Sequence, residues 1–423
     1  MTDDDVARRS EGARRAVEAV WRIESAKLIA VLARMVGDVG VAEELAQDAL
    51  VAALEQWPDS GIPRNPAAWL TSVAKRRAID GWRRQERLGD KYAQLARDLE
   101  SEDGLGDPAQ LAEEVIEDDL LRLVFVACHP VLSKPSRVAL TLKLLGGLST
   151  DEIARAFLAP SSTIAQRIVR AKRTLSAARV PFEVPDPSEF PQRLGSVLEV
   201  IYLIFNEGYS ATIGDDWMRP ALCHEALRLG RVLAELMPQE SEVHGLVALM
   251  EFQASRLGAR TTATGEPVLL QDQDRARWDR ILIRRGAGAL ERSEKLARGR
   301  GPYALQAAIA ACHATAPTAA DTDWEEIVAL YGALGQLTPS AVIELNRAVA
   351  LSMAYGPEAG LEVVDRLAVE GALSSYHLLP SVRADLLARL GRTTEARLEF
   401  ERAAALTGNE RERALLLERA SQQ

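Results

Sequence analysis

The stretch that decides the fold is LSTDEIARAFLAPSSTIAQRIVRAKRTL, from Leu148 to Leu175. It predicts a helix, a tight turn at 159–161 and a second helix. Ser149 and Glu152 have the spacing of a capping box, which would begin the first helix. The second helix combines a buried stripe with a polar outer face. The predicted stripe is Ile164, Ile168, Ala171 and Leu175, and the outward residues are Ser162, Thr163, Gln166, Arg167, Arg170 and Arg173.

This outer face has the character of a recognition helix for the major groove of DNA. Such a helix needs an apolar back and long hydrogen-bond donors that reach bases and phosphates. An ordinary helical hairpin with a solvated basic face would show the same pattern. The surrounding sequence therefore has to decide between the two interpretations.

A second basic segment precedes it: NPAAWLTSVAKRRAIDGWRRQERL, residues 65–88. Trp69 and Leu70 can pack inward, whereas the cations of this helix cannot be buried without a large cost in free energy. Trp82 beside these cations suits a single-stranded site, where an unpaired base stacks on an aromatic ring. Alternatively, Trp82 only packs between two domains and contacts no base. The candidate DNA-binding residues are Lys75, Arg76, Arg77, Trp82, Arg83, Arg84 and Arg87.

A third segment, VAEELAQDALVAALEQWP at 41–58, predicts an amphipathic helix. Leu45, Ala49 and Leu54 are expected to face a core. Its acidic outer face could bind a basic partner helix, although solvated charged faces are common. The outer residues are predicted to be Glu43, Glu44, Gln47 and Asp48.

The net charge of -10 is unevenly distributed along the chain. Residues 1–185 hold 26 Lys+Arg and 28 Asp+Glu, so the remainder holds 25 (51 minus 26) and 33 (61 minus 28), giving -2 and -8. Within the first part, residues 75–87 hold six bases and two acids, and 159–182 hold five bases and no acid. Two separate basic elements are typical of a protein that binds DNA phosphates.

The whole chain of 423 residues is predicted to be all-α, because aromatics are only 5% and no strand pattern stands out. Ten acids and no base lie between 98 and 119, and four prolines lie between 181 and 191. We expect a first domain at 1–97, an acidic linker at 98–119, a second domain at 120–180, a Pro-rich linker at 181–191 and a helical extension at 192–423. Asn346, Ala350 and Gly356 recur about 34 residues later as Pro380, Ala384 and Gly391, which suggests tetratricopeptide-like helix pairs.

The compartment can also be predicted from the sequence. No apolar run approaches the ~18 residues of a membrane span, and the acidic start MTDDDVARRS is unlike a signal peptide. Cys128, Cys223 and Cys312 are too few and too scattered for a disulfide framework. We expect a cytoplasmic protein without a membrane partner.

The three segments, in this order and with the acidic linker between them, resemble the two conserved domains of extracytoplasmic-function sigma factors in the sigma-70 family. The resemblance covers about the first 180 residues. It implies a helical sigma2 domain at 1–97 and a helix-turn-helix sigma4 domain at 120–180. It also implies that the AEELAQDAL helix binds the beta-prime clamp of core RNA polymerase, that Lys75 to Arg87 open and read the −10 element of the promoter, that Thr163 to Arg173 read the −35 element, and that the sigma4 domain meets the beta flap.

The rest of the chain resembles the long extension that one subgroup of these factors fuses to the sigma core. The resemblance implies regulation within the chain. As a hypothesis, seven polar and aromatic residues form an intramolecular contact or bind a protein partner or ligand: Asn206, Glu207, Tyr209, Asp272, Asp274, Arg275 and Trp278.

Two other classes of function compete with this interpretation. A metalloenzyme is suggested because every cysteine precedes a histidine, but adjacent helical residues point about 100° apart and no Cys-x-x-Cys spacing occurs. We therefore expect no metal, no cofactor and no catalysis. A helix-turn-helix transcriptional activator with a tetratricopeptide-like interaction domain would explain 148–175, but not the basic Trp-containing segment or the acidic linker. A pure scaffold would have no need of two basic elements.

Overall fold

Helices are the only regular elements in the described part of the chain, which confirms the all-α prediction. The computed structural model describes residues 3–85, 108–211, 217–262, 264–371 and 373–423, and these ranges contain no β-strand. The chain divides into two compact units, Met1–Val200 and Ile201–Gln423. Each is described below by itself.

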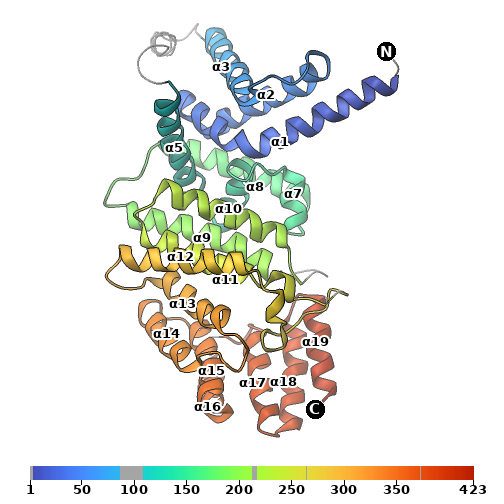
Figure 1. Ribbon diagram of the computed structural model, residues 1–423, viewed down its shortest axis with the longest axis vertical. Coiled ribbons are helices and arrows are strands. Elements are labelled where there is room, and N and C mark those ends of the chain that lie inside the picture. The colour runs from blue at the N-terminus through green and yellow to red at the C-terminus, as the bar shows by residue number, and fades with distance from the viewer. Residues whose placement is uncertain (1–2, 86–107, 212–216, 263, 372) are drawn as a thin grey trace. The chain divides into compact units, whose positions relative to one another are not determined.

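The first unit contains the helices that carry both basic segments (Figure 1). They are α1 (Asp3–Val36), α2 (Val39–Ser60), α3 (Pro66–Gln85), α5 (Pro108–Ala127), α6 (Lys134–Leu144), α7 (Thr150–Ala156), α8 (Ser161–Ala177) and the first half of α9 (Phe190–Tyr209).

Small residues let α1 and α2 pack closely. The Asp38 side chain accepts hydrogen bonds from Gly40 N and Val41 N, which fixes the start of α2. Alanines on its inner face, among them Ala42, Ala46 and Ala49, are fully buried. At the far end of α2, Trp57 is 2% exposed and its ring centroid lies 5.5 Å from that of Trp69 on α3. Trp57 is thus a core anchor that the sequence pattern did not identify, and Trp69, which is half-buried, packs against it.

The first half of α9 packs with α5 and α6. Arg193 Nη2 donates to Phe125 O (3.0 Å) and Ser196 Oγ donates to Cys128 O (2.6 Å). Phe125 belongs to the last turn of α5, whose carbonyls lack partners within that helix, so Arg193 caps it. The division between the units falls inside α9, at Val200. The five-part domain division made from the sequence stays a prediction.

Part of the predicted acidic linker lies in a helix. α5 begins at Pro108, and Asp119 on it is fully buried, with Arg122 Nη1 2.7 Å away. Burial raises the pKa of Asp119, although Arg34 and Arg122 oppose that shift. The earlier part of the predicted linker, 98–107, lies outside the described residues.

The second unit consists of the rest of α9 and a succession of short helices. These are α10 (Pro220–Leu236), α11 (Ser241–Ala254), α12 (Arg280–Leu296), α13 (Pro302–Thr315), α14 (Trp324–Leu337), α15 (Ala341–Tyr355), α16 (Pro357–Glu370), α17 (Leu378–Arg389), α18 (Thr393–Leu406) and α19 (Glu410–Ser421). Three single 3-10 turns join α11 to α12: η2 (Leu257–Ala259), η3 (Leu270–Asp272) and η4 (Arg275–Arg277).

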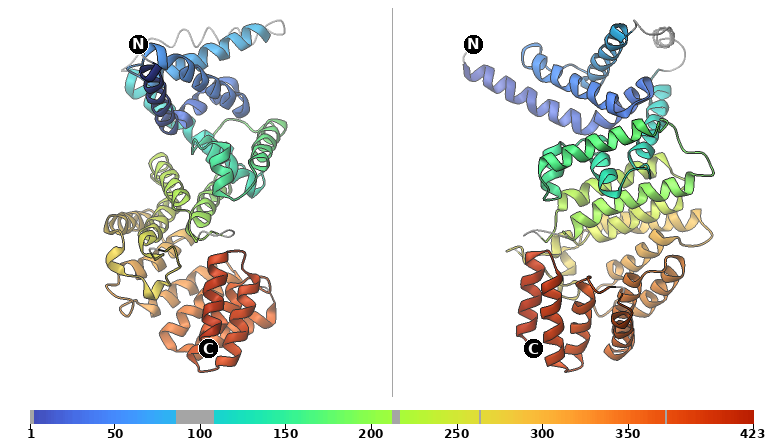
Figure 2. Two further views of the ribbon diagram at one scale, coloured as in Figure 1. Left: turned by 90° about the vertical axis from the view of Figure 1, so that its right-hand side faces the viewer. Right: turned by 180° about the vertical axis from the view of Figure 1, so that it is seen from behind.

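The 34-residue spacing corresponds to two helix pairs, α15 with α16 and α17 with α18. Ala350 and Ala384 are buried at equivalent places, and Gly356 and Gly391 both have positive φ, 102° and 76°. Figure 2 shows α17, α18 and α19 side by side. That the extension belongs to the tetratricopeptide class stays a prediction.

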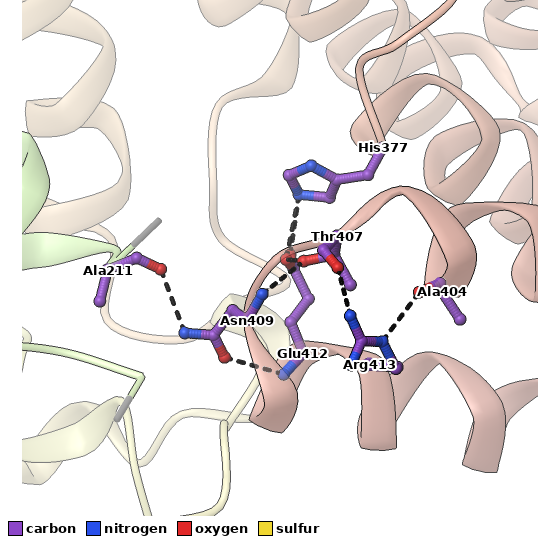
Figure 3. A network of polar contacts seen from close by, with 7 residues as sticks. All are labelled: Ala211, His377, Ala404, Thr407, Asn409, Glu412 and Arg413. Atoms are coloured by element: carbon purple, nitrogen blue, oxygen red, sulfur yellow. Dashed lines mark hydrogen bonds and ion pairs between the residues drawn. The ribbon is translucent and has the colours of Figure 1, made fainter. Parts of the chain in front are cut away.

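A polar network fastens the start of α19 to the segment after α9 (Figure 3). Asn409 is 2% exposed, accepts from Glu412 N (3.1 Å) and donates to Ala211 O (3.1 Å). Glu412 in turn contacts His377 Nε2 at 3.1 Å and Thr407 Oγ1. Burial alone would raise the pKa of Glu412, but the hydrogen bonds from His377 and Thr407 lower it overall. The network therefore holds residues 198 positions apart together within the second unit.

Candidate nucleic-acid interface

The helix-turn-helix forms as the sequence predicts. Ser149 Oγ accepts from Glu152 N (3.1 Å) and Ser149 N donates to Glu152 Oε2 (2.8 Å), so both halves of the capping box are present. The chain turns at Leu158, whose φ of 45° breaks the helix before α8. Ile164, Ile168, Ala171 and Leu175 are all 5% exposed or less.

The outer face of α8 is available to a ligand. Ser162, Gln166, Arg170 and Arg173 are exposed, and Thr163 and Arg167 are half-buried. Within the described ranges, Arg167, Arg170 and Arg173 take part in no ion pair. A row of guanidinium groups that lacks carboxylate partners is free to neutralise phosphates or to donate to guanine edges. The structure thus places the whole predicted set on one side of one helix.

The other basic segment lies on α3. Arg76 is exposed, Lys75 and Arg77 are half-buried, and Arg77 Nη1 donates to Asp48 O on α2 (2.8 Å). Its ion pair with the Asp48 carboxylate is longer, at 3.4 Å. Trp82, Arg83 and Arg84 fall within α3, but their side chains, and all of Arg87, lie outside the described residues. The structure therefore positions the segment on a helix and leaves its DNA contacts as predictions.

Two residues of α2 differ from the sequence prediction. Leu54, expected to face the core, is 38% exposed, and Glu43, expected outside, is 3% exposed. Glu44 and Asp48 are exposed, as an outer face requires, whereas Gln47 is half-buried. Val41 and Val51 extend that face, being 45% and 48% exposed. The prediction assumed that only one side of α2 is covered by other helices. It failed for Glu43 because α8 also packs against α2 there.

Glu43 is buried by two lysines of the predicted sigma4 domain. Lys172 of α8 forms an ion pair with one carboxylate oxygen of Glu43, and Lys143 Nζ of α6 lies 3.6 Å from the other. Gln47 Nε2 also donates to Glu43. A buried carboxylate needs such compensation, because an unpaired one would cost several kcal/mol. Glu43 therefore joins α2 to the helix-turn-helix within the first unit.

Two further ion pairs join α1 to α5 and to α7 within the first unit. Arg34 Nε of α1 lies 2.9 Å from the buried carboxylate of Asp119, and Arg22 Nη2 lies 2.5 Å from Glu152 Oε1. Arg22 is exposed, so its pair with Glu152 contributes little free energy. The pairs of Glu43 and Asp119 are the ones shielded from water.

The residues singled out in the extension are only partly brought together. Tyr209, Arg275 and Trp278 belong to one cluster, through Arg256 and Arg260, which the sequence analysis did not identify. Glu207 pairs with Arg219 instead. Asp272 and Asp274 are exposed, and Asp274 caps η4 through Ala276 N. Asn206 is half-buried and hydrogen-bonds Tyr202, so it belongs to the packing of α9.

The three Cys-His pairs do not converge. Cys128 and Cys223 are buried free thiols, and burial raises their pKa values to about 11 and about 12. Burial lowers the pKa of His129 to about 4, while its Nδ1 accepts from Val131 N. Among the residues that the structure describes, no three or more potential metal ligands lie together.

Comparison with known proteins gives three matching families. "Sigma-70 region 2" matches residues 22–88, "Sigma-70, region 4" matches 122–175, and a family of unknown function (DUF6596) matches 193–294. In the described part of the chain, no helix has both the length and the apolar character needed to cross a bilayer.

Curated relatives extend the likeness. An uncharacterized protein (R00370) of Rhizobium meliloti is 45% identical over 390 residues, 91% of this chain and 90% of the relative. The probable ECF RNA polymerase sigma factor SigI of Mycobacterium tuberculosis is 32% identical over 170 residues, 40% of this chain and 57% of the relative. The ECF RNA polymerase sigma factor SigW of Bacillus subtilis is 29% identical over 155 residues, 35% of this chain and 81% of the relative.

Regions 2 and 4 in this order, each with a basic helix, define a sigma-type initiation protein. The chain belongs to the extracytoplasmic-function sigma factors of the sigma-70 family and carries a long helical extension. Its general function is therefore transcription initiation, with core RNA polymerase and promoter DNA as partners.

Proposed function

We propose that this sigma factor divides its work among three helices and is regulated by its own extension. The outer face of α2, with Glu44, Asp48 and Val51, would bind the beta-prime clamp of the polymerase. The cations of α3 would open and read the −10 element, and the outer face of α8 would read the −35 element while its domain meets the beta flap. The observation that carries the proposal is the row of arginines on α8 that lacks carboxylate partners in the described ranges.

A transcriptional activator is the alternative, and gel shifts separate the two functions. A sigma factor should bind its promoter specifically only when core polymerase is present, because its DNA-binding domains depend on the polymerase for their spacing. An activator would bind the promoter tightly by itself. The measurement compares the shift of one labelled promoter with the protein alone, with core alone and with both.

The packed arrangement of the first unit cannot serve both promoter elements at once. The elements lie about 25 base pairs apart, or about 85 Å at about 3.4 Å per base pair. Helices α3 and α8 both contact α2, whose 22 residues span only about 33 Å. We infer that Glu43 must separate from Lys143 and Lys172 when the factor engages a promoter.

A disulfide across this contact tests that inference. A Cβ at position 40 would lie 3.7 Å from Cβ of Lys172, close to the ~3.8 Å of natural disulfides. We expect the double variant Gly40→Cys, Lys172→Cys to lose at least tenfold of its promoter-specific transcription when oxidised and to regain it after reduction. Each single cysteine variant is the control for the substitutions themselves. Equal activity of the oxidised and reduced double variant would show that no separation is needed.

A further inference from the structure

Arginines and aromatic rings alternate in one row inside the second unit. The row runs Arg260, Tyr209, Arg256, Trp278, Arg275. The guanidinium carbon of Arg260 lies 3.6 Å from the Tyr209 ring centroid, and that of Arg256 lies 5.8 Å from both Tyr209 and Trp278. The guanidinium carbon of Arg275 lies 4.7 Å from the Trp278 centroid. We call these five residues the arginine–aromatic row.

The two outer arginines of the row have structural roles. Arg275 Nη1 donates to His313 O (2.6 Å) and Ala316 O (2.7 Å), which caps the end of α13. Arg260 Nη2 donates to Tyr209 O (2.9 Å), and Arg260 Nε points to Met218 Sδ (3.1 Å). Both residues are only 9% exposed. Their hydrogen bonds are therefore used for packing the segments around them.

Arg256, in the middle, differs from its neighbours. It is half-buried, and its hydrogen bond in the described structure goes from Nη2 to Tyr209 Oη (2.6 Å). A guanidinium has five N–H donors, so most of those of Arg256 are left for another acceptor. The Nε1 donor of Trp278, a side chain only 2% exposed, also lacks an acceptor. The row thus contains unused donors on Arg256 and Trp278, and the buried Nε of Arg275 also lacks an acceptor.

The row also carries uncompensated positive charge. Within the described ranges, none of its three arginines forms an ion pair with a carboxylate. The Asp321 carboxylate attracts Arg275 without forming an ion pair with it in the described ranges, and it accepts a hydrogen bond from Thr318 Oγ1. Burial together with Arg256 and Arg275 lowers the pKa of His313 to about 3, so this histidine is neutral at physiological pH. Buried guanidinium groups without a counter-charge attract an anion.

From this geometry we propose that Arg256, whose guanidinium carbon lies 5.8 Å from the ring centroids of Tyr209 and Trp278, binds an oxyanion, a phosphate or carboxylate group of a small ligand. The flat guanidinium would hold two oxygens of the group at once, and the flanking arginines would add attraction without direct contact. The proposal rests on the proposed function, because such a ligand would be the signal that the regulatory extension detects. The sequence predicted an intramolecular contact or a ligand site that includes Tyr209, Arg275 and Trp278. The proposal names the chemical class of that ligand.

Binding of inorganic phosphate to the full-length chain tests the proposal without polymerase. We expect saturable binding in titration calorimetry, with a rise in the unfolding temperature at constant ionic strength. Arg256→Gln should weaken binding at least tenfold, whereas Arg284→Gln on the exposed side of α12 should leave it unchanged. Citrate in place of phosphate distinguishes a carboxylate ligand from a phosphate ligand. Absence of saturable binding by either anion, or equal binding by Arg256→Gln, would overturn the site.

Transcription assays distinguish a failure of the anion site from a failure of the proposed function. If the anion site fails, the unmodified protein still supports promoter-specific transcription with core polymerase. If the proposed function fails, no transcription depends on the chain, whether or not phosphate binds to Arg256. Far-ultraviolet circular dichroism of Arg256→Gln shows whether lost binding comes from lost folding, and Arg256→Lys provides a second variant that keeps the charge but removes the fork of donors.

Discussion

Replacing Arg167 and Arg170 together by alanine should lower promoter binding by the polymerase holoenzyme at least about 30-fold. Each arginine that donates to a base contributes about 1–3 kcal/mol, and about 1.4 kcal/mol corresponds to a tenfold change in affinity. Both residues lie on the outer face of α8, beside a stripe that is fully buried. The loss should come from DNA contacts, since surface substitutions of this kind change folding stability by less than about 0.5 kcal/mol.

Binding at several salt concentrations identifies the kind of contact that is lost. If the two arginines neutralise phosphates, the slope of log affinity against log salt should fall by about two. If they read bases, the slope should stay unchanged, and the protein should discriminate less between the −35 sequence and other sequences. The matched control replaces Arg397 and Arg402, exposed residues of α18, by alanine. A double variant at 167 and 170 that binds and transcribes like this control would refute the assignment of α8.

Ending the chain after Pro185 should unfold the sigma4 domain. The cut removes Arg193, which caps α5, and Ser196, which bonds Cys128 O and the buried Arg137. It also removes Val197 and Leu198, which are at most 3% exposed. Fully burying each such apolar side chain contributes about 1.5–3 kcal/mol, and unsatisfied buried groups cost about 1–3 kcal/mol each. Together these losses approach the ~5–15 kcal/mol that stabilises a typical domain.

A chain that ends after Tyr209 is the matched comparison, because it keeps all of α9. Amide hydrogen exchange in α5 and α8 measures the effect directly. The shorter chain should exchange these amides rapidly, and the longer one should protect them. Equal protection in both chains would mean that α9 is dispensable for the sigma4 domain. Regulation by the extension is therefore better tested with point variants than by deletion at 185.

Local signals explain why the helix-turn-helix could be predicted residue by residue. The capping box at Ser149, the break near Leu158 and the stripe from Ile164 to Leu175 each depend on neighbours within a few positions. A helical period also placed Trp69 on the inward side of α3, where it contacts Trp57. Such features need no knowledge of what packs elsewhere.

Contacts between distant residues account for what the sequence did not reveal. Glu43 resembles its exposed neighbour Glu44 in sequence, and it is buried by lysines far along the chain, among them Lys172, 129 positions away. Arg193 caps a helix end 68 residues earlier, and Arg256 meets Tyr209 from 47 residues away. Charged residues at helix edges and in turns have no periodicity that identifies such partners. Long-range ion pairs of this kind could be found only from the fold.

Transcription in vitro by core RNA polymerase, with and without the purified chain, tests the central claim most directly. The templates should be a library of genomic fragments from the source organism, and the 5′ ends of the transcripts are sequenced. We predict new start sites that require both core and this chain and that share one −35 and one −10 sequence. Start sites that need a different sigma factor, with this chain only raising their yield, would contradict the account.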